Sequence, residues 1–451
     1  MHPHRLDDEL LSFWIVRTAH ANRIKLQTFT TLAFGREAML WNRDVDRSAS
    51  DALLGALSAQ TGSSVEELRG GMLPSYEGTL FERHNANGNT NWILPLGIYH
   101  RTRKGFGVQF CPLCLFFDPI PYFRRSWRLS FSTMCDRHGT MLHDRCPGCA
   151  SPVVYFRNDL GKRSDYRIGD HVTCWKCGFD LRRAPTYGPF GPNGRAIMAL
   201  RSLVAFHNLG WWFQGDAVIP YGHLYFEALH HLLMCLPSAR GRRLLEFIER
   251  ETGWRAAIGD QAGRMPFDLR PIGVRHELLV AALWLLDDWP ERFVHAAKAV
   301  GLAQSHILRN EHRPFWFESE IRLNMGAGFG APTAEEAKNA AAYLAKGGDE
   351  VSGASVGRLI GGRDAEAAKP YAKAKAGPMS DVEFRRMIDR LDAEIAGLRP
   401  RSRRRLVLQR DKTIFRLIRL TGWTARKVLG LTVGDAVRLA SMLKGERDFP
   451  G

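Results

Sequence analysis

The spacing of the cysteines constrains this chain more than any other feature of its sequence. Seven of its eight cysteines lie between positions 111 and 177, where six form three Cys-x-x-Cys pairs and the seventh begins a Cys-x-x-His pair. Two residues between ligands let one tight turn direct both side chains at a single ion, and two such turns complete a tetrahedron. Pairing in chain order predicts two structural zinc ions, the first held by Cys111, Cys114, Cys135 and His138, and the second by Cys146, Cys149, Cys174 and Cys177.

Other roles for these cysteines are less consistent with the sequence. Disulfides need an oxidising compartment, which nothing in the chain indicates, and a thioredoxin-type pair would lie near a βαβ pattern. His138 is preferred over His143 because only His138 has the two-residue spacing. The eighth cysteine, Cys235, lies in an apolar helical stretch beside His230 and His231, and we expect a buried thiol and ordinary helix residues there. Four protein ligands leave no open position, so both sites are expected to support folding rather than to activate water.

The charge of the chain favours a polyanionic partner. The formal net charge is +16 over 451 residues, with a pI near 9.7. Two occupied sites would lower that charge by about three units, which still leaves a strongly basic protein. A merely basic protein without such a partner is the alternative. No apolar run approaches the roughly 20 residues of a membrane span, and the N-terminus does not read as a secretory signal. We therefore expect a cytoplasmic, nucleoid-associated protein with reduced thiols and no membrane contact.

The hydrophobic pattern predicts a mainly α-helical, multidomain protein. Apolar residues recur at helical spacing in residues 8–40 and 50–73, and Ser64 with Glu67 forms a capping box. Further helices are expected at 196–213, 224–236, 242–252, 277–287 and 290–300. In residues 126–133, Trp127, Leu129 and Phe131 alternate with polar residues, which predicts a half-buried strand packed in the ribbon core. The expected domains are an N-terminal helical part (1–108), a tandem zinc-ribbon module with short β-hairpins (109–185), a helical domain (195–325), a helix-turn-helix-like module (333–375) and a basic C-terminal helical, helix-turn-helix-like module (380–451).

Two modules in the C-terminal third are candidates for DNA contact. A helix-turn-helix places the start of its second helix in the major groove, and these starts fall near residues 352 and 424. Residues 399–427 contain eleven Lys and Arg and one acid, although a solvated helix face or a disordered tail would look similar. On the ribbon, an Arg pair at 124–125 could contact phosphates or be ordinary surface charge. The candidate DNA-binding residues are Arg124, Arg125, Ser352, Ser355, Arg358, Arg363, Arg403, Arg404, Arg405, Lys412, Thr424, Arg426 and Lys427. Trp423 is expected to be a core anchor.

The residues that carry the metal pattern also resemble a known family. The run CPLCLFFDPIPYFRRSWRLSFSTMCDRHGTMLHDRCPGC (111–149), the later CWKCGFDL (174–181) and the opening DELLSFWIVRTAHANRI (8–24) are similar to the TniQ family, which includes TnsD. The resemblance is specific over about residues 8–185. It implies a non-enzymatic target-site selector of a bacterial transposon, with paired zinc ribbons and helix-turn-helix domains. Some such proteins bind an attachment sequence directly, and others dimerise on an RNA-guided Cascade complex. Both kinds recruit an AAA+ ATPase to the selected site, and this ATPase then recruits the transposase.

The residues themselves argue against an enzyme. The chain has no phosphate loop, and its acids form no recognisable metal-binding set for a nuclease. Two non-enzymatic classes are left. The first reads specific duplex DNA and recruits the AAA+ ATPase, and the length and charge of the chain favour it. The second is an adaptor that docks as a homodimer on a Cascade-type guide-RNA complex and reads little sequence itself.

Overall fold

The computed structural model confirms a mainly helical protein. It describes residues 2–35, 40–99, 102–159, 170–214, 217–258, 265–309 and 313–325, together with single residues and short runs between 338 and 412. Contacts divide the chain into two compact units. The first comprises Met1–Trp212 and Ile219–Pro314, and the second comprises Phe213–Val218 and Phe315–Gly451. The five-domain division expected from the sequence stays a prediction. No helix among the described residues is both long and apolar enough to span a membrane.

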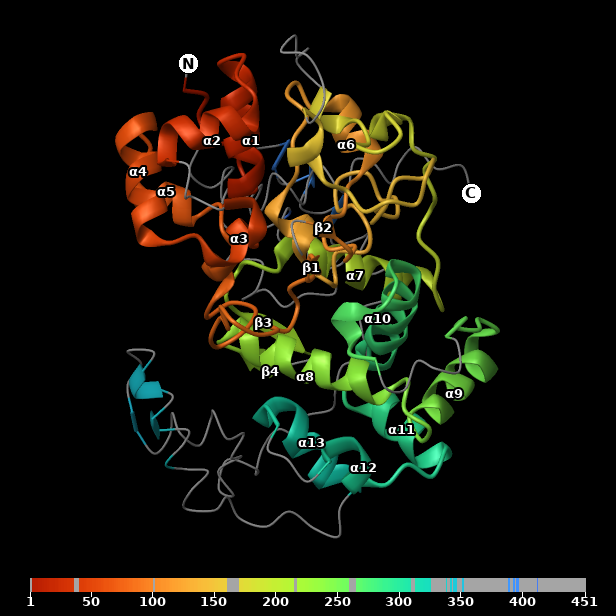
Figure 1. Ribbon diagram of the computed structural model, residues 1–451. Helices are drawn as coiled ribbons and strands as arrows, with labels where there is room; N and C mark the ends of the chain where they lie inside the picture. The colour runs from red at the N-terminus through yellow and green to blue at the C-terminus, as the bar shows by residue number, and fades with distance from the viewer. Residues whose placement is uncertain are drawn as a thin grey trace. The chain divides into compact units, whose positions relative to one another are not determined.

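Short helices form the N-terminal part of the first unit (Figure 1). They are α1 (Leu11–Ala21), α2 (Leu26–Phe34), α3 (Val45–Ser48), α4 (Asp51–Thr61) and α5 (Val65–Arg69). The predicted capping box is present at the start of α5, where Ser64 Oγ accepts from the backbone N–H of Glu67 and the Glu67 carboxylate accepts from that of Ser64. Helix α1 presents an almost wholly buried surface, because it packs against α2, α3 and the segment around Tyr155. It is therefore the central helix of this part.

The segment with the Cys-x-x-Cys pairs contains little regular secondary structure. It includes α6 (Pro112–Phe117) and the short 3-10 helices η3 (Arg125–Arg128), η4 (Tyr155–Arg157), η5 (Asp170–Val172) and η6 (Leu181–Arg183). A two-stranded sheet, β1 (Ile98–Tyr99) and β2 (Thr102–Arg103), precedes it. Among the described residues around the metal ligands, isolated antiparallel bridges join the chain, at Phe110 with His143, Met134 with Met141, Arg145 with Pro152, and Thr173 with Asp180. The expected β-hairpins are thus reduced to single bridges.

The half-buried strand predicted at 126–133 is wrong. A 3-10 turn begins the segment, and its polar residues are as buried as its apolar ones. Ser130 and Arg128 are fully inaccessible to solvent. Their polar groups have partners inside the protein, since Arg128 pairs with two aspartates and Ser130 donates to Asp268. An alternating pattern predicts a strand only where one face meets water, and here protein covers both faces. Trp127, Leu129 and Phe131 are buried in the core, as expected.

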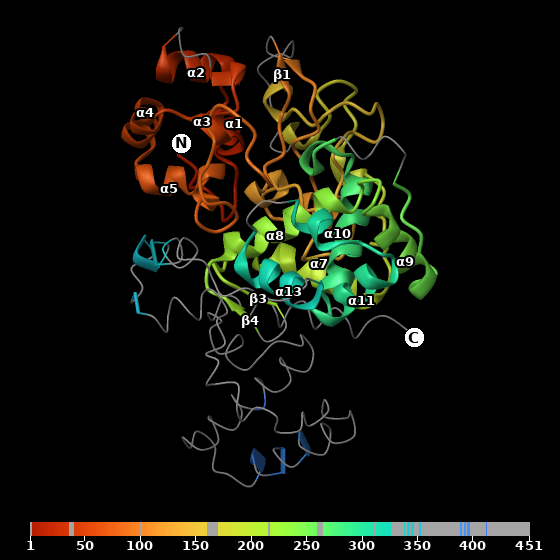
Figure 2. The same cartoon turned by 90° about the horizontal axis from the view of Figure 1, so that it is seen from below.

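A helical layer completes the first unit (Figure 2). Helix α10 (Ile272–Leu286) is buried on nearly all sides and packs against α7 (Gly194–Phe206), α8 (Gly222–Cys235) and α11 (Glu291–Ala299). Helix α9 (Arg242–Thr252) has the predicted bounds and packs on α11, and α12 (Gln304–Leu308) follows. The helix expected at 196–213 ends at Phe206. The strand β3 (Trp212–Gln214) follows it and pairs with β4 (Ala217–Ile219).

In the second unit, α13 (Phe315–Met325) is described in full. Among the scattered described residues beyond it, 338, 341, 342 and 344–346 are helical, as are 388, 389, 392, 393, 395, 396 and 412. Leu344, Ile388 and Ile395 are buried. These positions agree with the helices expected in both C-terminal modules. Residues 351 and 352, where the second helix of the first module is predicted to begin, are described and are not helical. The rest of both second helices lies outside the described residues.

Candidate metal centres

Two groups of four side chains converge in the first unit. One group contains Cys111, Cys114, Cys135 and His138, and the other contains Cys146, Cys149, Cys174 and Cys177. Within each group the candidate ligand atoms all lie within 4.8 Å of one another. The grouping is the one expected from combining the Cys-x-x-Cys and Cys-x-x-His pairs, here called knuckles, in chain order. Each group could therefore hold one metal ion.

The distances within the groups fit a tetrahedral ion. Cys114 Sγ lies 3.6 Å from Cys135 Sγ and 3.3 Å from His138 Nδ1, and Cys111 Sγ lies 3.6 Å from the same nitrogen. In the second group, two sulfur pairs, Cys146 with Cys177 and Cys149 with Cys174, are also 3.6 Å apart. Four ligands about 2.3 Å from a central ion would be separated by roughly 3.8 Å. The side chains are therefore already close to the positions that such an ion requires.

Tight turns place the ligands. The backbone N–H of Cys114 points at Cys111 Sγ, and that of His138 points at Cys135 Sγ, each at 3.4 Å. Gly139 follows the second of these pairs with φ +64° and donates to the Cys135 carbonyl oxygen, so the turn reverses in a conformation that favours glycine. Gly178 has φ +74° at the corresponding place after Cys177. The sequence pattern Cys-x-x-(Cys/His)-Gly is thus explained by backbone geometry.

His138 and His143 have different environments. His138 Nδ1 lies among the three sulfurs, and the ring stacks on Phe117. His143 instead donates from Nε2 to the carbonyl oxygen of Pro185 at 2.7 Å and stacks on Phe110. Its imidazole therefore supports the fold at a distance from both groups of ligands.

The protonation of the first group favours a bound cation. Hydrogen bonds from Cys114 and Cys135 hold the pKa of Cys111 well below its usual range. The pKa of Cys114 is raised to about 12, because its thiol donates to the Cys111 sulfur and is buried. The pKa of Cys135 is raised for the same two reasons. Because metal ligation requires deprotonated thiols, a divalent cation at this site would have to stabilise all three thiolates.

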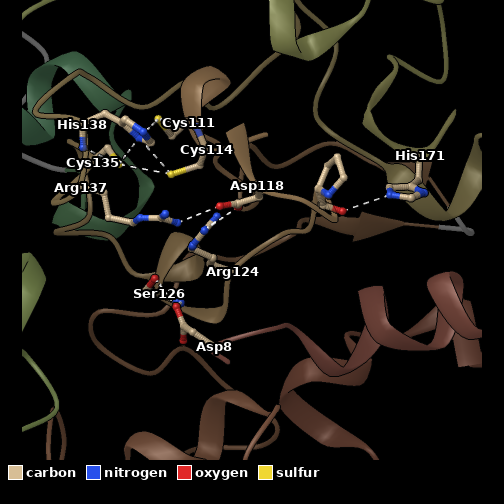
Figure 3. A network of polar contacts seen from close by, with 11 residues as sticks. Asp8, Cys111, Cys114, Asp118, Arg124, Ser126, Cys135, Arg137, His138 and His171 are labelled. Carbon is tan, nitrogen blue, oxygen red and sulfur yellow. Dashed lines mark hydrogen bonds and ion pairs between the residues drawn. The ribbon is translucent and has the colours of Figure 1, made fainter. Parts of the chain in front are cut away.

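A carboxylate ties the two halves of the first group together (Figure 3). Asp118 follows α6 directly and accepts from Arg124 Nη2 at 2.6 Å and from Arg137 Nη1 at 2.9 Å. Arg137 lies between the ligands Cys135 and His138 in the sequence. Asp118 therefore links the knuckle at 111–114 to the knuckle at 135–138. This role could not be predicted from the sequence, because neither residue spacing nor composition distinguishes Asp118 from the other acids.

The candidate DNA contacts on the ribbon have partners within the protein. Arg124 is 7% exposed, pairs with Asp118 and stacks on Tyr122 and Trp127. Arg125 donates to the Gly70 carbonyl oxygen at 2.6 Å and lies 3.4 Å from Asp8. The Arg124 guanidinium is thus paired within the ribbon, and the Arg125 guanidinium joins the ribbon to the N-terminal part. Because both side chains are paired within the fold, we do not propose them as phosphate contacts.

The other candidate DNA contacts belong to the second unit. Lys412 is helical and pairs with Asp392, and Ser352 is half-buried. The remaining candidates lie outside the described residues: Ser355, Arg358, Arg363, Arg403, Arg404, Arg405, Thr424, Arg426 and Lys427. Their role in DNA binding stays a prediction.

A buried polar cluster near the ribbon was not expected. Asp268 accepts from His230 Nε2 at 2.9 Å, from Ser130 Oγ at 2.5 Å and from the backbone N–H of Trp92 at 3.0 Å. It joins η8 (Phe267–Leu269), α8 and the ribbon core. Cys235 is buried near His231, as a small hydrophobic residue would be, and lies outside both groups of ligands.

Comparison with known proteins supports the resemblance noted in the sequence. No curated protein matches the chain. The TniQ family model matches residues 1–142. The match includes the N-terminal helices and the first group of ligands, and it ends before the second group, which begins at Cys146. The first 142 residues of the chain are therefore similar to the TniQ family.

Proposed function

We propose that this protein is a non-enzymatic target-site selector of a bacterial transposon, which binds specific duplex DNA and recruits an AAA+ ATPase and its transposase. The TniQ match over residues 1–142 carries the proposal, since that family is associated with transposition. The net charge of +16 supports a nucleic-acid partner. In this role the protein acts in the cytoplasm, at the nucleoid.

Zinc is the proposed occupant of both metal centres. Three thiolates with one imidazole, and four thiolates, are donor sets that zinc prefers in structural sites. Each group supplies four protein ligands, so an ion there would be fully coordinated by the protein. Its role would be to hold the knuckles of the ribbon in place, and chelation should unfold this part of the chain.

The C-terminal modules are the proposed DNA-reading parts. Ser352, Ser355 and Arg358 would lie at the start of one recognition helix, and Thr424, Arg426 and Lys427 at the start of the other. Arg363, Arg403, Arg404, Arg405 and Lys412 would contact phosphates. Residues 338, 341, 342, 344–346, 388, 389, 392, 393, 395, 396 and 412 are helical, whereas residues 351 and 352 are not.

A selection of random duplexes by the purified, metal-loaded protein tests the proposal. Strong enrichment of one sequence would support a direct reader. Affinity for that site should fall with salt by roughly 0.9 log units per log unit of salt for each phosphate contact. Deleting residues 399–451 should reduce this slope, and an unchanged slope would remove the basic stretch from the interface. Failure to enrich any sequence, together with co-purification as a homodimer with a Cascade-type guide-RNA complex, would replace the proposal with the adaptor function.

A further inference from the structure

A cavity of about 360 Å³ lies among four helices of the first unit, far in sequence from the metal ligands. Helices α8, α9 and α11, the turn after α8 and the segment around α12 surround it. Six of its apolar lining residues are less than 9% exposed: Leu232, Cys235, Leu244, Phe293, Leu302 and Ile307. The volume is near the lower end of the roughly 300–1,000 Å³ typical of ligand sites. The cavity is therefore suited to one or two large apolar side chains.

The turn between α8 and α9 gives the cavity a fixed wall. Ser238 Oγ donates to the carbonyl oxygen of Cys235 at 2.6 Å and accepts from the backbone N–H of Gly241 at 3.1 Å. A Cβ atom at Gly241 would overlap the Cys235 carbonyl oxygen, so only glycine allows this close approach. Because these contacts hold the turn, a ligand would meet a preformed cavity, which lowers the cost of ordering on binding.

The mouth of the cavity is basic. Arg240 and Arg309 are exposed and line it, and His306 is half-buried beside them. None of the described residues that line the cavity is acidic. Arg309 Nη2 donates to the Met234 carbonyl oxygen at 3.3 Å. This contact holds the arginine side chain at the rim of the cavity. A ligand that places carboxylates at the mouth and an apolar group inside would match both the charge and the polarity of this site.

We infer that this cavity is a docking site for a partner protein, which inserts one large apolar side chain from an acidic peptide segment. The apolar lining residues bind the inserted side chain, and Arg240 and Arg309 contact the flanking carboxylates. Interfaces concentrate their binding energy in such anchors within preformed pockets. The phosphates of duplex DNA could pair with the two arginines, but duplex DNA has no projecting apolar group that would fill the cavity. The inference is independent of whether the C-terminal modules read DNA.

Fluorescence anisotropy with short labelled peptides tests the inference on the full-length, metal-loaded protein. The probe peptides carry a central Phe or Leu flanked by Asp and Glu. Matched peptides replace the central residue with Ala or the acids with Lys. We expect saturable binding that needs both the apolar residue and the acids. If no acidic peptide binds saturably, or if peptides with Lys flanks bind equally well, the inference is wrong.

Two variants locate the binding site. Ser305 is exposed at the cavity, so Ser305→Trp should fill it and weaken binding by at least about tenfold, whereas Ala59→Trp on the exposed face of α4 should not. Arg240→Glu should weaken binding several-fold and reduce its salt dependence, whereas Arg183→Glu, at an exposed position on the ribbon, should not. Equal effects within either pair would contradict the inference.

A photoreactive leucine at the centre of the peptide gives a second readout that does not depend on any variant. Crosslinks should map to residues 232–244, to Phe293 or to residues 302–309, and crosslinks elsewhere would overturn the assignment. A homodimer that Ser305→Trp dissociates would instead identify a second copy of this chain as the occupant. DNA affinity of each variant, measured in parallel, should be unchanged.

Discussion

Replacing Arg128 should test whether a buried ion cluster joins the ribbon to the N-terminal helices. The Arg128 side chain is fully inaccessible and lies 2.6 Å from an Asp44 oxygen and 3.3 Å from an Asp46 oxygen. It also donates to the Leu94 carbonyl oxygen at 3.0 Å. Asp46 accepts from the backbone and hydroxyl of Ser12 at the start of α1. Removing the arginine would leave Asp46 buried without a cation, which costs about 3–5 kcal/mol in comparable sites.

The loss should depend on pH. Burial, followed by repulsion from Asp44, raises the pKa of Asp46 to about 6 even with Arg128 present. Without the guanidinium, the folded-state pKa should rise further above the value in the unfolded chain. A carboxyl with a raised folded pKa binds a proton on folding, so its ionisation destabilises the fold as pH rises. Arg128→Met should therefore be more destabilising at pH 8 than at pH 5, and adding Asp46→Asn should restore part of the stability.

Urea unfolding followed by tryptophan fluorescence at both pH values would measure these differences. Arg182→Met is the matched control, since Arg182 pairs with Asp180 but is 38% exposed and should cost no more than about 1 kcal/mol. Equal losses for the two variants, or a loss for Arg128→Met that is the same at both pH values, would refute the assignment of a buried, charge-dependent contact.

Three further predictions concern the metal centres and the Asp268 cluster. Cys135→Ser should lose one metal ion per chain, measured by elemental analysis, and should melt at a lower temperature, whereas Cys235→Ser should retain both ions; equal metal contents would argue against the ligand assignment. His138→Ala should weaken metal binding at the first centre in a chelator competition, and His143→Ala should not, because only His138 points at the sulfurs. Although burial opposes it, hydrogen bonding holds the pKa of Asp268 below its usual value, so its contribution to stability is lost as pH falls through the folded pKa. Asp268→Asn should thus cost about 1.5–3 kcal/mol near neutral pH, and a cost that does not shrink below about pH 4 would contradict this reasoning.

Local patterns in the sequence were sufficient for several features. The two groups of ligands follow from pairs of residues three positions apart, because a single tight turn fixes both members of each pair. The capping box at Ser64 and Glu67 spans three residues, and the bounds of α9 follow from its apolar spacing. The mainly helical fold could be predicted for the same reason. Each of these features depends on contacts within one turn or one helix.

The role of a residue could not be predicted from the sequence where that role depended on burial. Arg124 and Arg125 read as surface charge or phosphate contacts, yet both are paired within the fold. The polar residues of 126–133 suggested a solvent-facing side, but the N-terminal helices and α10 supply partners for them, such as Asp44 for Arg128 and His276 for Thr133. The local sequence around a charged or hydroxyl side chain is the same whether its hydrogen-bond partner is water or a residue distant in the chain.

The sequence by itself thus determined the helical class, the two sets of metal ligands and the resemblance to the TniQ family, since each is encoded in short-range spacing. The tertiary structure alone decided which arginines are buried, that Asp118 joins the two knuckles of the first centre, and that an apolar cavity with a basic mouth lies between α8 and α12. The physical reason is that these features are made by residues tens to more than a hundred positions apart, or by groups whose environment only packing defines. Their electrostatic and packing energies arise only when folding brings the segments together.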